Sequence, residues 1–384
     1  MASKLQRALR LTVAGLIAAW LPAMAQERID PANSIKFDIN DDAPIQVASF
    51  DAAESRVSSR GGAQVIDLHV LAKLKNRGRD TIRSVTLLLV AGEATPGGKM
   101  ASSAATANVA PGDTFDMRID GRLMRPVRTD GGPLVRVKVD GVLFKNYDFY
   151  GPDLVKSHRQ MLAWAMEADR DRKYFKQVLL TRGKAGLQQE MLESLSRQSE
   201  RPQLDVQLSR GRATTSAALQ PDKIAEFAFL QIPDSPIKPT KGWAEIAHNE
   251  ARSPQIEIQN TSSKSIRYVE VAWLVKDLQG KEYFAGSVPA SEGELYLPPG
   301  RSARLLQDTS LRFSSNGGRP VDIQDMRGFV SEVEYSDHNI WVPKRETLQH
   351  SDLWRVIPPS PEEQHLTSLY LKSIDTLIRE LNKF

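Results

Sequence analysis

The feature that most constrains the fold of this chain is an internal repeat. The stretch KNRGRDTIRSVTLLLV, which begins at Lys75, aligns with QNTSSKSIRYVEVAWLV, which begins at Gln259, when Asn76 is placed under Asn260 at an offset of 184 residues. Two further blocks follow in the same order at slightly larger offsets: VAPGDTFDM resembles LPPGRSARL, and VRVKVDGVLF resembles VSEVEYSDHNIWV. Three blocks in one order predict two copies of one module.

Apolar and polar residues alternate within each copy, which is the two-residue period of a half-buried β-strand. In the second copy, one face carries Val269, Val271, Trp273 and Val275. The opposite face carries Tyr268, Glu270, Ala272 and Lys276, and in the first copy the inward places fall to Val85, Leu87 and Leu89. Turn sequences such as NTSSKS, DLQGK and SSNGG separate these segments. The pattern predicts antiparallel β-sandwiches.

Helical patterns follow each copy. From Pro152 the chain reads DLVKSHRQMLAWAMEADRDRKYFKQVLL, and Asp153 can serve as the N-cap of a long amphipathic helix. Its apolar side would consist of Leu154, His158, Met161, Leu162, Ala165, Phe175 and Leu179. TRGKAG interrupts this helix, LQQEMLESLSRQ forms a second one, and EEQHLTSLYLKSIDTLIRELNKF forms a third at the C-terminus. We expect these helices to pack within the chain rather than on another one.

The predicted fold class is therefore mainly β with helices (α+β), built from two antiparallel sandwich modules that are each followed by an amphipathic helix. We divide the chain into a signal peptide (1–25), the first module (26–152), a helical connector (153–200), the second module (201–357) and a C-terminal helix (358–384). Within the second module, residues 232–255 contain four prolines and predict a long surface loop.

The second copy resembles bacterial immunoglobulin-like modules of the FxLYD type and their CARDB-like relatives. The match rests on an Asn-Thr-Ser turn between two strands, an Asp-x-x-Gly turn after the second strand and a Pro-Gly before a later one. The residues that carry it are Asn260, Thr261, Ser262, Asp277, Gly280, Pro299 and Gly300. The resemblance implies an immunoglobulin-like fold and an extracytoplasmic interaction role, and it implies no active site.

The N-terminus indicates export. Three basic residues precede the apolar run LTVAGLIAAWLPAMA, which ends in Ala23-Met24-Ala25 ahead of Gln26. This is the pattern of a secretory signal peptide cleaved after Ala25, so we expect a periplasmic or secreted protein. No later segment is apolar enough to span a membrane, and the absence of cysteine excludes disulfides.

Charge argues against a nucleic-acid partner. The formal net charge of +4 falls to +1 once the three basic residues of the signal peptide are removed, and the remaining charges of both signs are interspersed.

Several motifs suggest chemistry but lack its context. Ser235-Pro-Ile-Lys238 matches a Ser-x-x-Lys motif, although the flanking prolines oppose the helix that this motif requires. Asp38-x-Asn40-x-Asp42 begins like a calcium loop but lacks the later glycine and glutamate. The six histidines show no metal-ligand spacing, and His158 is expected to be a packed core residue. We predict no metal and no cofactor.

The preferred functional hypothesis is a non-enzymatic exported protein that mediates protein–protein or cell-envelope interactions. Its contact residues would be Trp243, His248 and Glu250 in the 232–255 segment, because long loops on sandwiches often carry function. The partner and the oligomeric state stay open.

Two alternatives remain. A carbohydrate- or peptidoglycan-binding module would use aromatic clusters, namely Phe144, Tyr147, Phe149 and Tyr150 in the first copy and Trp341 with Trp354 in the second. A hydrolase would place its site around His248.

Overall fold

The computed structural model describes residues 27–127, 132–202, 204–210, 223–290, 294–306, 309–315, 318–349 and 351–383. The predicted signal peptide, residues 1–25, lies outside these residues. The chain is mainly β with several antiparallel sheets and a smaller helical part, so the predicted α+β class is confirmed at that level. None of the helices in the described part is long and apolar enough to cross a membrane.

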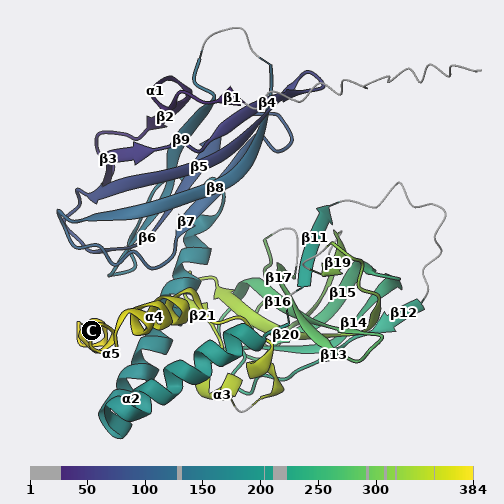
Figure 1. Cartoon of the computed structure of the whole chain (residues 1–384). Coiled ribbons are helices and arrows are strands. Elements are labelled where there is room, and N and C mark those ends of the chain that lie inside the picture. The colour runs from purple at the N-terminus through teal and green to yellow at the C-terminus, as the bar shows by residue number, and fades with distance from the viewer. Residues whose placement is uncertain are drawn as a thin grey trace, which may run out of the picture.

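Residues 27–150 form two sheets, which we call the first sheet pair (Figure 1). The first sheet contains β1 (Glu27–Arg28), β4 (Arg56–Arg60), β5 (Ala63–Asn76), β3 (Ile45–Asp51) and β8 (Thr114–Pro126). The second contains β10 (Phe149–Tyr150), β9 (Val135–Phe144), β6 (Ile82–Val90), β7 (Lys99–Ala104) and β2 (Ile35–Asp38), which follows the short helix α1 (Pro31–Ser34). Both sheets contribute to one core, into which Val85, Leu87 and Leu89 point as predicted.

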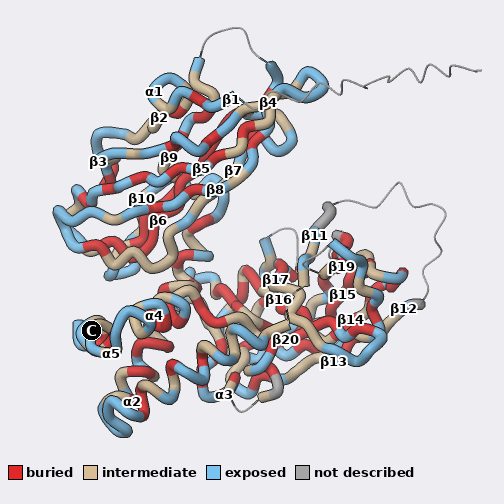
Figure 2. The backbone as a smooth tube through the Cα atoms, in the orientation of Figure 1, coloured by how far each residue is buried: buried red, intermediate tan, exposed pale blue. Residues whose placement is uncertain are grey.

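Residues 204–341 form the second sheet pair. Its β15 sheet contains β11 (Leu204–Arg210), β19 (Thr309–Ser315), β15 (Glu250–Asn260), β14 (Ile237–Ala247), β12 (Lys223–Glu226) and β18 (Ser302–Leu306). Its β16 sheet contains β13 (Ala228–Phe229), β20 (Ile323–Tyr335), β16 (Ile266–Asp277), β17 (Glu282–Pro289) and β21 (Ile340–Trp341). Between them lie the predicted inward residues Val269, Val271, Trp273 and Val275. Figure 2 shows the buried residues running along the strands of both pairs.

The two sheet pairs share details of connection and hydrogen bonding. In each pair, one short early strand joins a sheet in parallel: β2 beside β9, and β13 beside β20. The fully buried amide of Asn76 donates to the carbonyls of Asp80 and Val109 and accepts from the backbone N–H of Gly78. Asn260, also fully buried, makes the same set of bonds to Lys264, Leu297 and Ser262.

The segment 232–255, predicted to be a long loop, is instead largely a β-hairpin of β14 and β15. Its prolines are accommodated rather than excluded. The register shifts immediately after Pro239, and Ser253 with Pro254 lies in a second irregularity opposite Ala244. A proline lacks a backbone donor and is tolerated in a sheet at such bulges, so proline content misled the prediction.

Helix α2 (Ser157–Glu200) occupies the predicted connector and bends at Gly183. The predicted interruption at TRGKAG is confirmed: φ 66° and ψ −166° at Gly183 lie in a region open almost only to glycine. The helix begins at Ser157, not directly after Asp153, although the Asp153 carboxylate accepts a hydrogen bond from the first-turn N–H of His158, as predicted. Buried Asp140 accepts hydrogen bonds from the N–H of Val155 and the hydroxyl of Ser157, so the preceding turn is held outside the helix and Leu154 is exposed.

The C-terminal segment forms α3 (Arg345–Gln349), the 3₁₀ helix η1 (Asp352–Arg355), α4 (Pro361–Lys372) and α5 (Ile374–Leu381). The single predicted terminal helix is therefore two, because extended Ser373 ends α4 and caps α5 by accepting from the N–H of Thr376. In Figure 1, α4 and α5 lie beside α2, and the three share a small core that includes Phe175, Leu187, Leu366 and Leu377.

Candidate functional site at the junction of helix α2 and the β16 sheet

A cavity of about 300 Å³ lies between α2, the outer face of the β16 sheet and the segment that leads into α4. Helix α2 contributes Trp164, Glu167 and Arg170 to its wall. The sheet contributes Glu270, Phe284, Phe329 and Glu332, and Pro358, Pro359 and Pro361 close the third side. Carboxylates and aromatic rings thus share one concave surface, a combination suited to ligand recognition.

Two of these carboxylates face each other across neighbouring strands. Glu270 on β16 is the direct partner of Glu332 on β20, and both side chains line the cavity. Like charges at directly opposite positions destabilise a sheet. Helix α2 places Arg159 near this pair: its Nε lies 3.4 Å from Oε1 of Glu332, and its guanidinium lies 3.5 Å from the ring centroid of Tyr268. The Tyr268 hydroxyl donates to Glu270 at 2.6 Å.

Glu332 is 5% exposed, and among the residues that the structure describes none donates a hydrogen bond to its Oε1. Burial raises the pKa of Glu332 well above its usual range, and the charge of Glu270 adds to this effect, while Arg159 opposes it. Arg159 lies in ion-pair range of Oε1 without donating a hydrogen bond to it, and a buried acceptor without a hydrogen bond destabilises the folded chain. The cavity therefore contains an acidic group whose hydrogen bonding is incomplete.

Glu167 is the third carboxyl group of the cavity. Part of its side chain is exposed to the open space of the cavity, so the residue is only half-buried, and protein surrounds the rest of it. Burial raises the pKa of Glu167 to about 7; the Arg170 cation works against this shift, and the nearby charges of Asp171 and Glu270 reinforce it. At neutral pH this group is close to half protonated.

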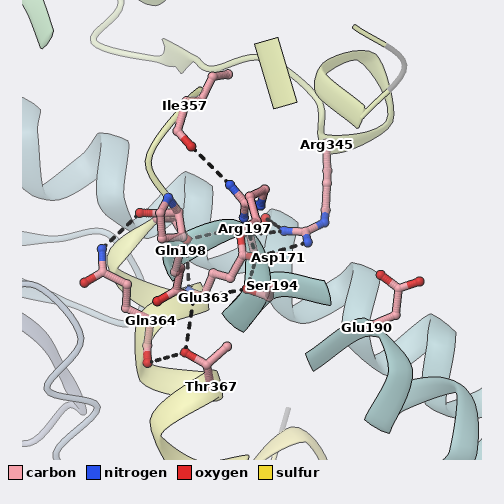
Figure 3. Close-up of polar contacts among 12 residues, drawn as sticks. Asp171, Glu190, Ser194, Arg197, Gln198, Arg345, Ile357, Glu363, Gln364 and Thr367 are labelled. Carbon is pink, nitrogen blue, oxygen red and sulfur yellow. Dashed lines mark hydrogen bonds and ion pairs between the residues drawn. The ribbon is translucent and has the colours of Figure 1, made fainter. Parts of the chain in front are cut away.

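A buried ionic network fixes the elements behind the cavity (Figure 3). Arg345 of α3 donates to Asp171 of α2 and to Glu363 of α4, both at 3.1 Å. Glu363 also accepts from Arg197 at 2.6 Å and from Ser194. The Arg345 guanidinium lies 4.6 Å from the ring centroid of Trp354. Because every member is bonded to partners on other elements, α2, α3 and α4 hold one arrangement.

Arg170 links this network to the cavity. Its guanidinium lies 2.9 Å from Asp171 and donates to the carbonyl of Pro343 at 3.0 Å, while its side chain also lines the cavity wall. The charges of Arg170 and Arg345 hold the pKa of Asp171 below its usual value, although burial opposes this. Arg170 is thus committed to Asp171, and its charge is largely balanced there.

The structure places the predicted contact residues elsewhere, on the β14–β15 hairpin. Trp243 is half-buried on β14, pairs with Gln255, and has the guanidinium of Arg304 at 4.3 Å from its ring centroid. His248 is exposed at the hairpin turn with φ 51°, and its carbonyl accepts from Ile323. Glu250 is buried and lies 3.0 Å from Arg252. Trp243 lies in the middle of β14, whereas His248 and Glu250 lie at the hairpin turn, so the three residues do not form one cluster.

The predicted aromatic cluster of the first copy lies where β9 and β10 meet α2. Phe149 stacks on His158 with ring centroids 4.3 Å apart, and burial lowers the pKa of His158. Tyr147 donates to Asp169 of α2, which is also bonded to Arg83 at 3.1 Å. These rings lie in the contact between the first sheet pair and the helix.

The Ser-x-x-Lys motif and the calcium-loop-like motif have structural roles only. The Ser235 hydroxyl donates to the carbonyl of Ile237, in a turn that leads into β14 rather than in a helix. Asp38 accepts from Arg136 at 2.7 Å and lies 3.2 Å from Lys36. Within the described residues, no group of three histidines or acidic residues is arranged to hold a metal ion.

Sequence reasoning missed the cavity residues. The alternation in β16 placed Glu270 on the outward face, where a glutamate is ordinary, and nothing in the sequence indicated that α2 would cover it. The one available signal is that Tyr268 and Ala272 share this outward face, which makes it less polar than a solvated face.

No protein-family profile and no curated protein matches this chain. Among solved structures, ApaA from Bordetella pertussis is 15% identical over 38% of this chain and 90% of its own, with a TM-score of 0.18. A β-glucosidase from Kluyveromyces marxianus is 9% identical over 70% of this chain and 45% of its own (TM-score 0.16). A two-domain protein from Bacteroides fragilis is 7% identical over 78% and 92% (TM-score 0.11). At these values they supply neither a family nor an activity.

Proposed function

We propose that this chain is an exported, non-enzymatic protein of two immunoglobulin-like modules that binds a protein or another component of the cell envelope. The tandem duplication is supported by the repeated sequence blocks, by the shared parallel pairing of β2 with β9 and of β13 with β20, and by the matching bonds of Asn76 and Asn260. In a duplicated module, one copy can keep the original structure while the other acquires a binding site, and the helices that surround the two copies here differ.

The observation that carries the proposal is the cavity on the β16 sheet. It combines aromatic rings with carboxyl groups, and the buried network of Asp171, Arg345 and Glu363 holds its walls in one geometry. A preformed site of this kind loses little entropy when a ligand binds. The aromatic and acidic walls suit recognition of a polar partner group.

Co-sedimentation with envelopes tests the proposal. The mature chain, residues 26–384, is incubated with isolated envelopes of the producing organism, and bound protein is measured as a function of concentration. We expect saturable binding that Trp164→Ala weakens about tenfold or more, because an aromatic side chain in a concave site is a common energetic anchor.

Trp243→Ala is the matched control, since Trp243 is also half-buried but belongs to the β14–β15 hairpin. We expect it to bind as the unaltered chain does. Loss of binding in Trp243→Ala but not in Trp164→Ala would move the site to the hairpin, and no saturable binding in any form would refute the proposal. Thermal unfolding of both variants confirms that each is folded.

A further inference from the structure

The structure assigns a specific ligand chemistry to the cavity: we propose that it binds an organic cation, a primary ammonium or guanidinium group. This inference rests on the proposed binding function and names the class of group that the site recognises. It follows from the charge balance of the wall, from the incomplete bonding of Glu332 and from the aromatic surfaces beside it.

Acidic side chains predominate on the cavity wall, and their charge develops as the pH rises through the raised pKa values of Glu167 and Glu332. Glu167, Glu270 and Glu332 line the wall, whereas its cations are largely committed to other groups. Arg170 bonds Asp171 at 2.9 Å and the carbonyl of Pro343. Arg159 lies against the Tyr268 ring and 3.4 Å from Glu332. Arg159 is therefore the one arginine left to face these three carboxyl groups, and when they are ionised a ligand with positive charge would complete the balance.

Glu332 supplies the second and independent indication. It is 95% buried, it lines the cavity, and no described residue donates a hydrogen bond to its Oε1. Its partner across the strands is another glutamate, Glu270. Arg159 balances part of the charge at Oε1, but two facing carboxyl groups repel each other when both are ionised, and an ammonium or guanidinium group that donates to them from the cavity would relieve this repulsion.

The aromatic walls fit the same ligand. Trp164 of α2, Phe284 of β17 and Phe329 of β20 line the cavity beside the carboxyl groups. A cation is attracted to the face of an aromatic ring, most strongly to tryptophan. The volume of about 300 Å³ admits a cationic head group with a short alkyl stem, as in a lysine or arginine side chain or a small amine.

Protonation should oppose binding, because the ligand requires charged carboxylates. Glu332 faces Arg159 and Glu167 on α2, Glu270 on β16 and Glu334 on its own strand. Glu167 faces Arg170 and Asp171 on α2, Glu270 on β16 and Glu363 on α4. Acidic neighbours outnumber basic ones around both groups, and they raise the pKa of each. Cation binding should therefore release protons and weaken as pH falls from 8 toward 5.

Titration calorimetry with the mature chain tests the inference. The probes are n-butylammonium and ethylguanidinium, with n-butanol as the uncharged control of similar shape. A second arm uses Ac-Gly-Arg-Gly-NH2 and Ac-Gly-Gln-Gly-NH2 to distinguish a peptide side chain from a free amine. We expect saturable binding of a cation in at least one arm and none of the matched neutral probe.

Glu332→Gln is the decisive variant. It should weaken cation binding at least about tenfold while leaving the unfolding midpoint unchanged or higher, because it removes one of two opposed carboxylates. A purely structural role for Glu332 would instead lower the midpoint. Glu250→Gln is the control: Glu250 is also buried in the second sheet pair, at 7% exposure, but bonds Arg252 outside the cavity, so cation binding should persist.

Equal binding of charged and neutral probes, or full binding by Glu332→Gln, would overturn the inference. If neither arm shows cation binding but Trp164→Ala still loses envelope binding, the ligand class is wrong and the binding function stands. If envelope binding is also absent from every form, both proposals fail.

Discussion

At the scale of single residues, one buried amide connects three parts of each sheet pair. Asn260 bonds the turn after β15 through Ser262 and Lys264, and it also reaches the carbonyl of Leu297, 37 residues later in the chain. No other uncharged side chain of this size offers two donors and an acceptor in one plane. The Asn of the Asn-Thr-Ser turn is therefore a structural requirement of this turn rather than a ligand-binding feature.

Asn260→Ala should lower the stability of the second sheet pair by about 2–3 kcal/mol, because it leaves buried backbone groups without partners. Asn76→Ala should act similarly on the first. Calorimetric unfolding measures both. Gln259→Ala, one position earlier on β15, should change stability by no more than about 0.5 kcal/mol; equal effects of the two substitutions in β15 would contradict this account.

Glu167 links the stability of the chain to pH. Its folded-state pKa of about 7 lies above the ordinary glutamate value of 4.5. The protonated form is thus favoured by folding, so the associated stability is present below pH 4.5 and is lost as pH rises through 7. Glu167→Gln should be more stable than the unaltered chain at pH 8, by about 1 kcal/mol after allowance for its half-exposed side chain, and equal at pH 4.

Urea unfolding at the two pH values measures the difference for Glu167. Glu282→Gln provides a contrast, because Glu282 is ion-paired with Arg327 at 2.5 Å, and its loss should give no gain at pH 8. A pH-independent effect of Glu167→Gln would show that the carboxyl group titrates normally.

At the scale of elements, the bend of α2 depends on Gly183. With φ 66° and ψ −166°, this residue lies where a β-carbon is strongly disfavoured, even though open space surrounds it. Gly183→Ala should destabilise the helical layer by about 1–3 kcal/mol, whereas helix propensity alone would predict a gain of about 1 kcal/mol. Thermal unfolding followed by far-ultraviolet circular dichroism shows whether the substitution lowers or raises the stability.

Ala185→Gly serves as the control for the bend, since Ala185 is exposed inside the second half of α2. It should cost about 1 kcal/mol through propensity alone. A stabilised Gly183→Ala variant would mean that α2 tolerates a straight path through residue 183.

Periodicity predicted the parts of this fold that depend on local pattern. The inward places of Val269, Val271 and Trp273 follow from the two-residue period, because a strand has only two faces. The period does not specify what covers the outward face. That depends on where α2 docks, and so the environment of Glu270 was not predictable from its strand.

Local rules also failed where tertiary contacts override them. Asp153 accepts from the first-turn N–H of His158 at 2.9 Å, as an N-cap would, yet Asp140, 13 residues earlier, holds the backbone at Val155 so that the helix begins only at Ser157. Pro239 and Pro254 suggest a loop by composition, yet a sheet accepts them at bulges. The predicted contacts at Trp243, His248 and Glu250 rested on that loop, so the cavity residues replace them in our proposal.

At the scale of the whole molecule, α2 contacts both sheet pairs. Arg83 of β6 donates to the carbonyl of Ala165 at 3.2 Å, and Arg159, less than two turns earlier on α2, reaches Tyr268 and Glu332 of the second pair. The helical layer that α2 forms thus begins in contact with both sheet pairs and is no free tether; in Figure 1 the rest of α2 continues away from the first pair.

Arg345→Ala should loosen this layer. Arg345 is 2% exposed, and its removal leaves Asp171 and Glu363 buried without their shared cation, at a cost of about 3–5 kcal/mol. We expect a lower unfolding midpoint and faster proteolysis of the segment 342–361. Exposed Arg319→Ala should change neither quantity; equal proteolysis rates for the two variants would show that the network does not hold the layer.

The span of this network has a consequence for the order in which the protein matures. Asp171 and Arg345 are 174 residues apart. A chain that emerges from its N-terminus can complete the first sheet pair early, but Asp171 must wait for nearly the whole remaining chain before its partner arrives. Closing so long a loop is slow. We therefore expect the wall of the cavity to form last, after the C-terminal helices have been made.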